Sequence, residues 1–262
     1  MDIAAYEIEA EIEGTHWWFA GRRRLFAAEI ERTGLDQDAA ILDIGTSTGT
    51  NLRMLRTLGF GNVQGLDASE EAIRFCVRKG FNTVRKGDVC GMPFASSAFD
   101  LVLATDVIEH VDDDAQAMAE IARILKPGGI ALITVPTFRC LWGLQDEIAK
   151  HKRRYRKREL LALVTSSGMR IERQYYFNYL LFLPIWLGRR LIQWLGTPLK
   201  SEAEVNSPVI NRLLSLVFTA DTMTAPVLHL PFGVSALVLA KKAAISSKPG
   251  EQNVQNRETR RE

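Results

Sequence analysis

Two aspartates at the ends of predicted strands have the chemistry and the positions to bind a nucleoside. Asp43 lies near the end of the apolar strand 40–44, and Asp67 directly follows the apolar segment 63–66. A carboxylate after the second strand of an α/β unit can accept hydrogen bonds from both hydroxyls of a ribose. Because ligands bind parallel sheets at the carboxyl ends of the strands, we expect both side chains to face the same space.

The segment between these strands begins with a turn of small side chains that opens a helix near Leu52. Gly45 and Gly49 allow backbone angles that a side chain would forbid, and they let a ligand approach the main chain. The unpaired N–H groups and the positive dipole end of the helix would face that ligand. The spacing lacks the third glycine that dinucleotide binders place against a pyrophosphate, which argues against an NAD site.

Residues 43–49 resemble motif I, D-x-G-x-G-x-G, of the class I S-adenosylmethionine-dependent methyltransferases, as found in small-molecule members of the ubiquinone-pathway type. Ser47 stands where that family usually has its middle glycine, and a serine fits there if its backbone angles stay ordinary. The resemblance implies S-adenosyl-L-methionine as the cofactor, with Asp67 on the ribose. It places Asp88 at the exocyclic amine of the adenine, with Val89 among the apolar residues beside the ring.

The segment after the apolar strand 99–104 is similar to the family's "hxxxExLEH" loop. The resemblance places Thr105 against the cofactor. It implies that Glu109 and His110 mainly brace the loop, and a role for His110 as a base is the alternative.

The N-terminal segment 1–35 is predicted to form a helical lid. It contains the sequence HWWFAGRRR at residues 16–24, in which three large aromatics precede an arginine triplet. In related methyltransferases this segment covers the cofactor, which makes Arg22 and Arg23 candidates to bind its methionine carboxylate. Bidentate pairing with a carboxylate is the physical reason for an arginine there. The alternative is an aromatic staple followed by a solvated basic helix.

Apolar strands alternate with helical segments, which predicts an α/β fold. The resemblance to the methyltransferase family implies a doubly wound, Rossmann-like, mostly parallel seven-stranded sheet with an antiparallel last strand, and here a helical insertion is expected before that strand. The predicted domain spans 36–177 and 231–245. The predicted strands are 40–44, 63–66, 81–84, 99–104, 130–135, 170–177 and 232–241, with a turn at 126–129.

The predicted insertion, 178–230, separates the last two strands and is strongly apolar. Its apolar run of ten residues is shorter than the ~20 that a membrane-spanning helix needs. Leu187, Leu191 and Trp194 recur at helical spacing, while Arg189 is predicted to face away. This pattern fits a helix in a membrane interface, a helix packed on the sheet or an oligomer contact. The polar tail 246–262 is predicted to be disordered.

Residues 150–158 read KHKRRYRKR and lead into a helix. The charge run favours contact with an anionic partner, although a solvated helix start is the simpler explanation. His151 and Tyr155 lie where the family often has substrate-facing residues, so they are the catalytic candidates. The imidazole of His151 could take a proton near neutral pH, or it could simply belong to the basic segment.

Composition narrows the class of protein. The formal net charge of the 262-residue chain is +2, which by itself does not indicate nucleic-acid binding. The three cysteines show no C-x-x-C spacing and no paired histidines, so we expect reduced thiols and no metal site. The acidic N-terminus does not resemble a signal peptide. We therefore expect a cytoplasmic protein, with peripheral binding to the inner face of the membrane left open.

The leading functional prediction is an S-adenosylmethionine-dependent methyltransferase. The apolar insertion favours a small or lipid-linked amphipathic acceptor, methylated on oxygen rather than carbon. One alternative is a methyltransferase-like protein without turnover that serves in membrane docking or assembly. A lesser alternative is a serine hydrolase, because Gly45-x-Ser47-x-Gly49 matches a nucleophile elbow. The prediction leaves the oligomeric state open.

Overall fold

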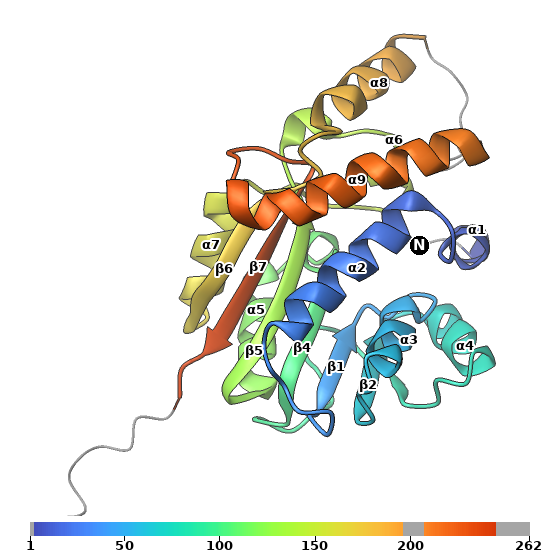
Figure 1. The fold of residues 1–262 in the computed structure, drawn as a ribbon. Helices are drawn as coiled ribbons and strands as arrows, with labels where there is room; N and C mark the ends of the chain where they lie inside the picture. Colours follow the sequence, from blue (N-terminus) through green and yellow to red (C-terminus); the bar gives the residue numbers. More distant parts are fainter. Residues whose placement is uncertain (1–2, 196–206, 245–262) are drawn as a thin grey trace, which may run out of the picture.

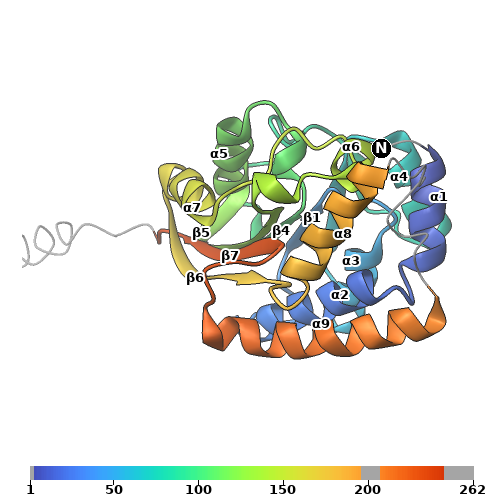
Figure 2. The same cartoon turned by 90° about the horizontal axis from the view of Figure 1, so that it is seen from above.

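The computed structural model describes residues 3–195 and 207–244, which contain a seven-stranded sheet with helices on both faces (Figures 1 and 2). The strand order is β3-β2-β1-β4-β5-β7-β6, and among these strands only β7 runs against the others. The predicted fold class is therefore confirmed. The strands are β1 (Ile41–Ile44), β2 (Val63–Asp67), β3 (Val84–Lys86), β4 (Phe99–Thr105), β5 (Leu125–Pro136), β6 (Met169–Phe177) and β7 (Ser235–Lys242).

Helices cover the sheet because its central strands are apolar on both sides. Helices α5 and α7 bury their apolar residues against one face, and α2, α3 and α9 bury theirs against the other. The described helices are α1 (Ile3–Ile12), α2 (Trp17–Glu31), α3 (Thr50–Thr57), α4 (Glu70–Arg78), α5 (Asp114–Ile124), α6 (Leu144–Ile148), α7 (Lys157–Ser166), α8 (Phe182–Leu195) and α9 (Pro208–Leu228), with short 3-10 helices η1 (Ile108–His110) and η2 (Arg139–Leu141).

Several strand boundaries differ from the prediction, among them the start of β7 at Ser235 and not at 232, and two of the differences have a local reason. The third strand was placed at 81–84 but occupies 84–86, because Phe81 turns inward and packs near Gly49 instead of joining the sheet. The predicted turn 126–129 lies inside β5 as an irregularity, since the register with β4 shifts between the pairs at Leu125 and Ile130. Such an irregularity adds residues to one strand without ending it.

The segment between β6 and β7 contains two helices. The second of them, α9, has Pro226 inside its last turn. Figure 1 shows α8 and α9 at the upper end of the sheet, where the parallel strands end, and Figure 2 shows the same end from above. The tail 246–262, predicted to be disordered, lies outside the described residues. No helix in residues 3–195 or 207–244 has the length and apolar character required to span a bilayer.

Candidate active site at the carboxyl edge of the sheet

The turn after β1 has the backbone geometry that its glycines predict. Gly45 and Gly49 have φ values of +69° and +85°, a region that favours glycine. A side chain at Gly45 would lie 2.7 Å from Val107 Cγ2, and one at Gly49 would meet Phe81 at 3.2 Å. Packing against Val107 and Phe81 therefore also favours glycine at these two positions.

Ser47 does not have the ordinary backbone angles that the sequence analysis required of it. Its φ is +47°, in the left-handed region that costs a residue with a side chain roughly 1–2 kcal/mol. Strained residues of this kind concentrate at functional sites. The conformation directs the Ser47 backbone N–H at Asp67 Oδ2, with an N···O distance of 3.0 Å.

Asp67 is oriented by the backbone of two turns. Its Oδ2 accepts from Ser47 N, and its Oδ1 accepts from Ser69 N at 2.8 Å. Burial raises the pKa of Asp67, while the backbone hydrogen bonds oppose the rise. An ionised carboxylate has about four lone-pair directions. Each oxygen therefore keeps one direction for a further donor, as a pair of ribose hydroxyls would require.

Asp88 and Val89 lie just beyond the end of β3, the strand next to β2. Asp88 is exposed, and its Oδ1 accepts from Cys90 N at 2.9 Å, so the turn fixes the carboxylate while leaving it accessible. Val89 is buried. These positions would give a base one polar and one apolar contact.

The sequence analysis missed Asn51, which connects the two predicted residues Asp43 and Thr105. The Asn51 side-chain amide donates to Asp43 Oδ1 at 3.0 Å and to Thr105 Oγ1 at 3.1 Å. Asp43 is fully buried, and its Oδ2 has no hydrogen-bond partner. Burial raises the pKa of Asp43 to about 7, and the bond from Asn51 partly offsets this. The bridge joins β1, α3 and β4 at the edge where the strands end.

The N-terminal segment contributes two glutamates that the sequence analysis did not single out. Glu9 lies in α1, and Glu13 directly follows it. Glu13, in the turn that follows α1, is buried. It accepts a hydrogen bond from the Thr48 hydroxyl and one from Lys79 Nζ at 2.8 Å. Burial raises the pKa of Glu9 to about 7. The N-terminal segment thus brings carboxylates as well as arginines to the glycine turn.

The two candidate arginines on α2 have different partners. Arg22 Nη2 lies 2.7 Å from Asp106 Oδ2, and the Arg22 guanidinium lies 5.2 Å from the centre of the Trp18 ring. Arg23 Nη1 is buried without a hydrogen-bond partner, and burial lowers the pKa of this side chain. Arg23 therefore has the donor that a ligand carboxylate would need.

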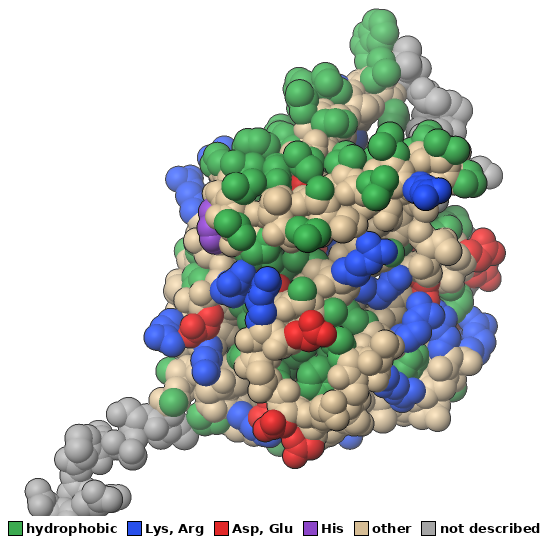
Figure 3. Space-filling view, viewed as in Figure 1, with side chains coloured by type: hydrophobic (Ala, Val, Ile, Leu, Met, Phe, Trp, Pro, Cys, Tyr) green, Lys and Arg blue, Asp and Glu red, His purple; other side chains and the backbone are tan. Residues whose placement is uncertain are grey.

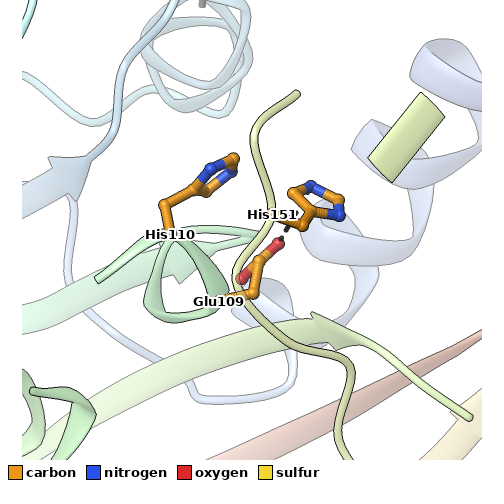
Figure 4. A group of neighbouring side chains, drawn as sticks. All are labelled: Glu109, His110 and His151. Atoms are coloured by element: carbon orange, nitrogen blue, oxygen red, sulfur yellow. Dashed lines mark ion pairs between the residues drawn. The ribbon is translucent and has the colours of Figure 1, made fainter. Parts of the chain in front are cut away.

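The loop after β4 brings its residues to the segment that follows α6. Figure 4 shows Glu109, His110 and His151 side by side, with the Glu109 carboxylate directed at His151. His151 Nε2 lies 3.9 Å from Glu109 Oε1, and His151 Nδ1 lies 2.8 Å from Asp146 Oδ1. The rings of the two histidines are 4.7 Å apart. These contacts place His151 at a polar centre, as expected of a catalytic candidate.

Tyr155 does not fit its predicted substrate-facing role. Its side chain is 5% exposed, and its hydroxyl donates to Asp114 Oδ2 at 2.7 Å. Burial, followed by the contact with Asp114, raises the pKa of the phenol far above its ordinary value. A phenol held in this way cannot serve as a base near neutral pH. We assign Tyr155 a structural role.

The basic segment 150–158 is neutralised in part from within the chain. Lys152 Nζ lies 2.5 Å from an oxygen of Asp112, and Arg154 Nε lies 2.7 Å from an oxygen of Asp146. Arg153 likewise pairs with a carboxylate of α5. The charge run therefore has a structural explanation, and the predicted anionic partner is not needed to account for it.

The geometry also bears on the hydrolase alternative. A nucleophilic serine needs a base within hydrogen-bond reach. In residues 3–195 and 207–244, the Ser47 hydroxyl makes no hydrogen bond with a histidine, and its oxygen is buried. The match to a nucleophile elbow is therefore one of spacing only.

The strand order and the antiparallel β7, with Asp67 as the last residue of β2, are those of the class I methyltransferase α/β fold. Comparison with known proteins agrees. Residues 42–133 match the family model described as a methyltransferase domain. The demethylmenaquinone methyltransferase of Chlorobaculum parvum is 34% identical over 116 residues, which cover 43% of this chain and 48% of that protein. Over residues 42–133, this chain is therefore similar to methyltransferase domains.

Solved structures show the same fold. A S-adenosylmethionine-dependent methyltransferase of Thermotoga maritima, described as a possible histamine N-methyltransferase, superposes with a TM-score of 0.58 at 18% identity, covering 92% of this chain and 96% of that one. The cyclase SpnF superposes with a TM-score of 0.58 at 22% identity, covering 85% and 81%. The chain spans about half, or less, of the length of several curated relatives that it matches. Such likenesses establish the fold and leave the reaction to be argued from the site.

Proposed function

We propose that this chain transfers a methyl group from S-adenosylmethionine to an oxygen atom of a small or lipid-linked amphipathic acceptor. The observation that carries the proposal is the meeting of Asp43, Asp67 and Thr105 around one glycine turn at the carboxyl edge of the sheet. The bound cofactor supplies an activated methyl group. The protein then has to orient the reactants, exclude water and help to remove a proton.

Four groups of this chain would hold the cofactor. Asp67 binds the ribose hydroxyls, and Asp88 with Val89 binds the adenine. Arg23 has an unpaired buried donor suited to the methionine carboxylate. The unpartnered Oδ2 of Asp43 gives the turn a further acceptor directed at the same space. These unpaired buried atoms fit a polar ligand, since such groups are costly when left without partners.

The acceptor would approach from α8 and α9, which expose a broad apolar surface at this end of the molecule (Figure 3). Arg189 attaches α8 to the site, because its guanidinium points inward to the Leu141 carbonyl and lies 3.5 Å from Asp146. This is opposite to the orientation predicted for Arg189. The outward residues of α8 are Leu183, Leu187, Leu191 and Trp194, of which Trp194 is 82% exposed. Contiguous exposed apolar patches on a protein surface often mark binding surfaces.

We propose that this surface docks on the inner face of a membrane, where a lipid-linked acceptor would be found. Leu187→Asp with Leu191→Asp should reduce flotation with phosphatidylglycerol vesicles by at least about tenfold, because burying each leucine contributes roughly 1.5–3 kcal/mol. Val77→Asp, an equally exposed apolar residue on α4, is the matched control and should float like the unmodified chain. Equal flotation of the double variant would contradict membrane docking through α8.

Calorimetry of the purified chain with S-adenosylmethionine tests the first step of the proposed function. We expect saturable heat at micromolar cofactor, followed by methyl transfer to a component of a membrane lipid extract. The absence of heat at high micromolar cofactor would contradict the proposal. Cofactor binding without transfer to any acceptor would instead support the alternative of a docking or assembly role without turnover.

A further inference from the structure

Glu109, His110 and His151 form a cluster of potential ligand atoms beside the proposed cofactor site. Each residue offers one ligand atom, and the three atoms lie within 4.8 Å of one another. They come from two separate segments, η1 and the chain after α6 (Figure 4). The sequence analysis predicted no metal site, because these histidines share no spacing motif.

Glu109 is the unusual member of the cluster. Its side chain is fully buried, and neither carboxylate oxygen makes a hydrogen bond. The 3.9 Å separation from His151 Nε2 is longer than a hydrogen bond. Burial raises the pKa of Glu109 well above its ordinary value. A buried carboxylate without a partner is costly, so this arrangement calls for a cation or a proton at the cluster.

The nearby arginines do not supply that partner. Arg22 pairs with Asp106 at 2.7 Å, and Arg154 pairs with Asp146 at 2.7 Å. Their charges are thus largely compensated by other carboxylates. The Glu109 carboxyl group thus faces the two imidazoles without a hydrogen-bond partner.

His151 is oriented by a carboxylate on the far side of its ring. Asp146 holds His151 Nδ1 at 2.8 Å, which directs Nε2 toward Glu109. A carboxylate behind a histidine in this way is the usual support of a metal-binding imidazole.

We propose that Glu109, His110 and His151 bind one divalent transition-metal ion, with Zn²⁺ or Co²⁺ as suitable occupants. Two imidazoles and one carboxylate are a known donor set for such ions and leave coordination positions open. Ligand atoms at about 2.1 Å from a tetrahedral ion are roughly 3.4 Å apart, so ligand atoms that now lie up to 4.8 Å apart have to approach by up to about 1.4 Å. Side-chain rotation can supply a movement of that size.

The open position would bind the hydroxyl oxygen of the acceptor and lower its pKa, so that the proton would be released to water before the oxygen attacks the methyl group. This catalytic role depends on the proposed methyl transfer to oxygen. The binding of the ion does not depend on it. The metal ion, and not His151 as a base, would then promote loss of the proton from the acceptor.

Titration of the tag-free, chelator-treated full chain with Co²⁺, followed by visible absorption, tests the proposal without cofactor or acceptor. We expect the visible absorption to saturate at one Co²⁺ ion per chain. Its bands should be those of Co²⁺ in a low-symmetry site. Glu109→Gln and His151→Gln should each weaken binding by at least about tenfold. His229→Asn is the matched control, since His229 is exposed and its left-handed backbone suits asparagine; it should bind Co²⁺ like the unmodified chain.

The competing explanation is an ion pair between Glu109 and a protonated His151. It predicts no saturable Co²⁺ absorption by the unmodified chain, or equal binding by Glu109→Gln, and either result would overturn the proposal. Circular dichroism of each variant without metal separates loss of ligands from loss of fold. If one variant fails to fold, His110→Gln gives the same comparison. Because the titration contains no S-adenosylmethionine, its outcome is independent of the calorimetric test of the proposed function.

Discussion

Asp67→Asn should weaken the binding of S-adenosylmethionine by roughly 10- to 150-fold, which corresponds to the ~1.5–3 kcal/mol of a hydrogen bond to a charged group. Both Asp67 oxygens already accept a backbone N–H, from Ser47 and from Ser69. An asparagine has only one oxygen, so its amide nitrogen would face one of these N–H groups. The variant would lose the correct carboxylate orientation together with one acceptor for the ribose.

Glu70→Gln is the control for this experiment. Glu70 is exposed three residues after Asp67 and pairs with Lys86 at 2.6 Å, so its removal changes the local charge equally without touching the turn. Calorimetry should give an unchanged dissociation constant for Glu70→Gln. If the two variants bind the cofactor equally well, Asp67 does not contact the ribose, and the proposed position of the cofactor is wrong.

The sheet could be predicted because its signals are local. Residues 101–104 are a continuous apolar run, as expected of a strand buried on both faces, and in the structure they lie within β4. Small residues at 45–49 between a strand and a helix predict a turn in the same way. Each of these patterns is complete within about ten residues, so no knowledge of distant contacts was needed.

The side-chain pairing of the site could not be predicted in this way. Asn51 is an ordinary helix residue by sequence, and only the sheet places it between Asp43 and Thr105. The basic segment 150–158 has many charges, but the carboxylates that pair with it lie elsewhere in the chain. A count of charges cannot separate an ion pair within the fold from a surface that awaits a partner.

Asp146→Ala should lower the free energy of unfolding by roughly 3–5 kcal/mol, the usual effect of removing one partner from a buried ion pair. Asp146 is fully buried and accepts from Arg154 Nε at 2.7 Å, from His151 Nδ1 at 2.8 Å and from Gly143 N at 2.9 Å. Without it, the buried guanidinium of Arg154 would have lost its carboxylate partner. Urea denaturation at pH 7 measures the change, and Asp38→Ala, at an exposed loop position, should alter stability by less than about 0.5 kcal/mol.

The effect of Asp146→Ala should also depend on pH in a defined direction. Burial alone would raise the pKa of Asp146, but the bonds from His151, Arg154 and Gly143 together lower it to about 2, below its ordinary 3.8. The folded state therefore favours the ionised form, so the stabilisation is fully present above pH ~4 and is lost as the pH falls toward 2. The difference in unfolding free energy between the unmodified chain and the variant should shrink by roughly 2–3 kcal/mol over that interval. A difference that stays constant from pH 7 to pH 2 would show that Asp146 stabilises the fold through packing and not through its charge.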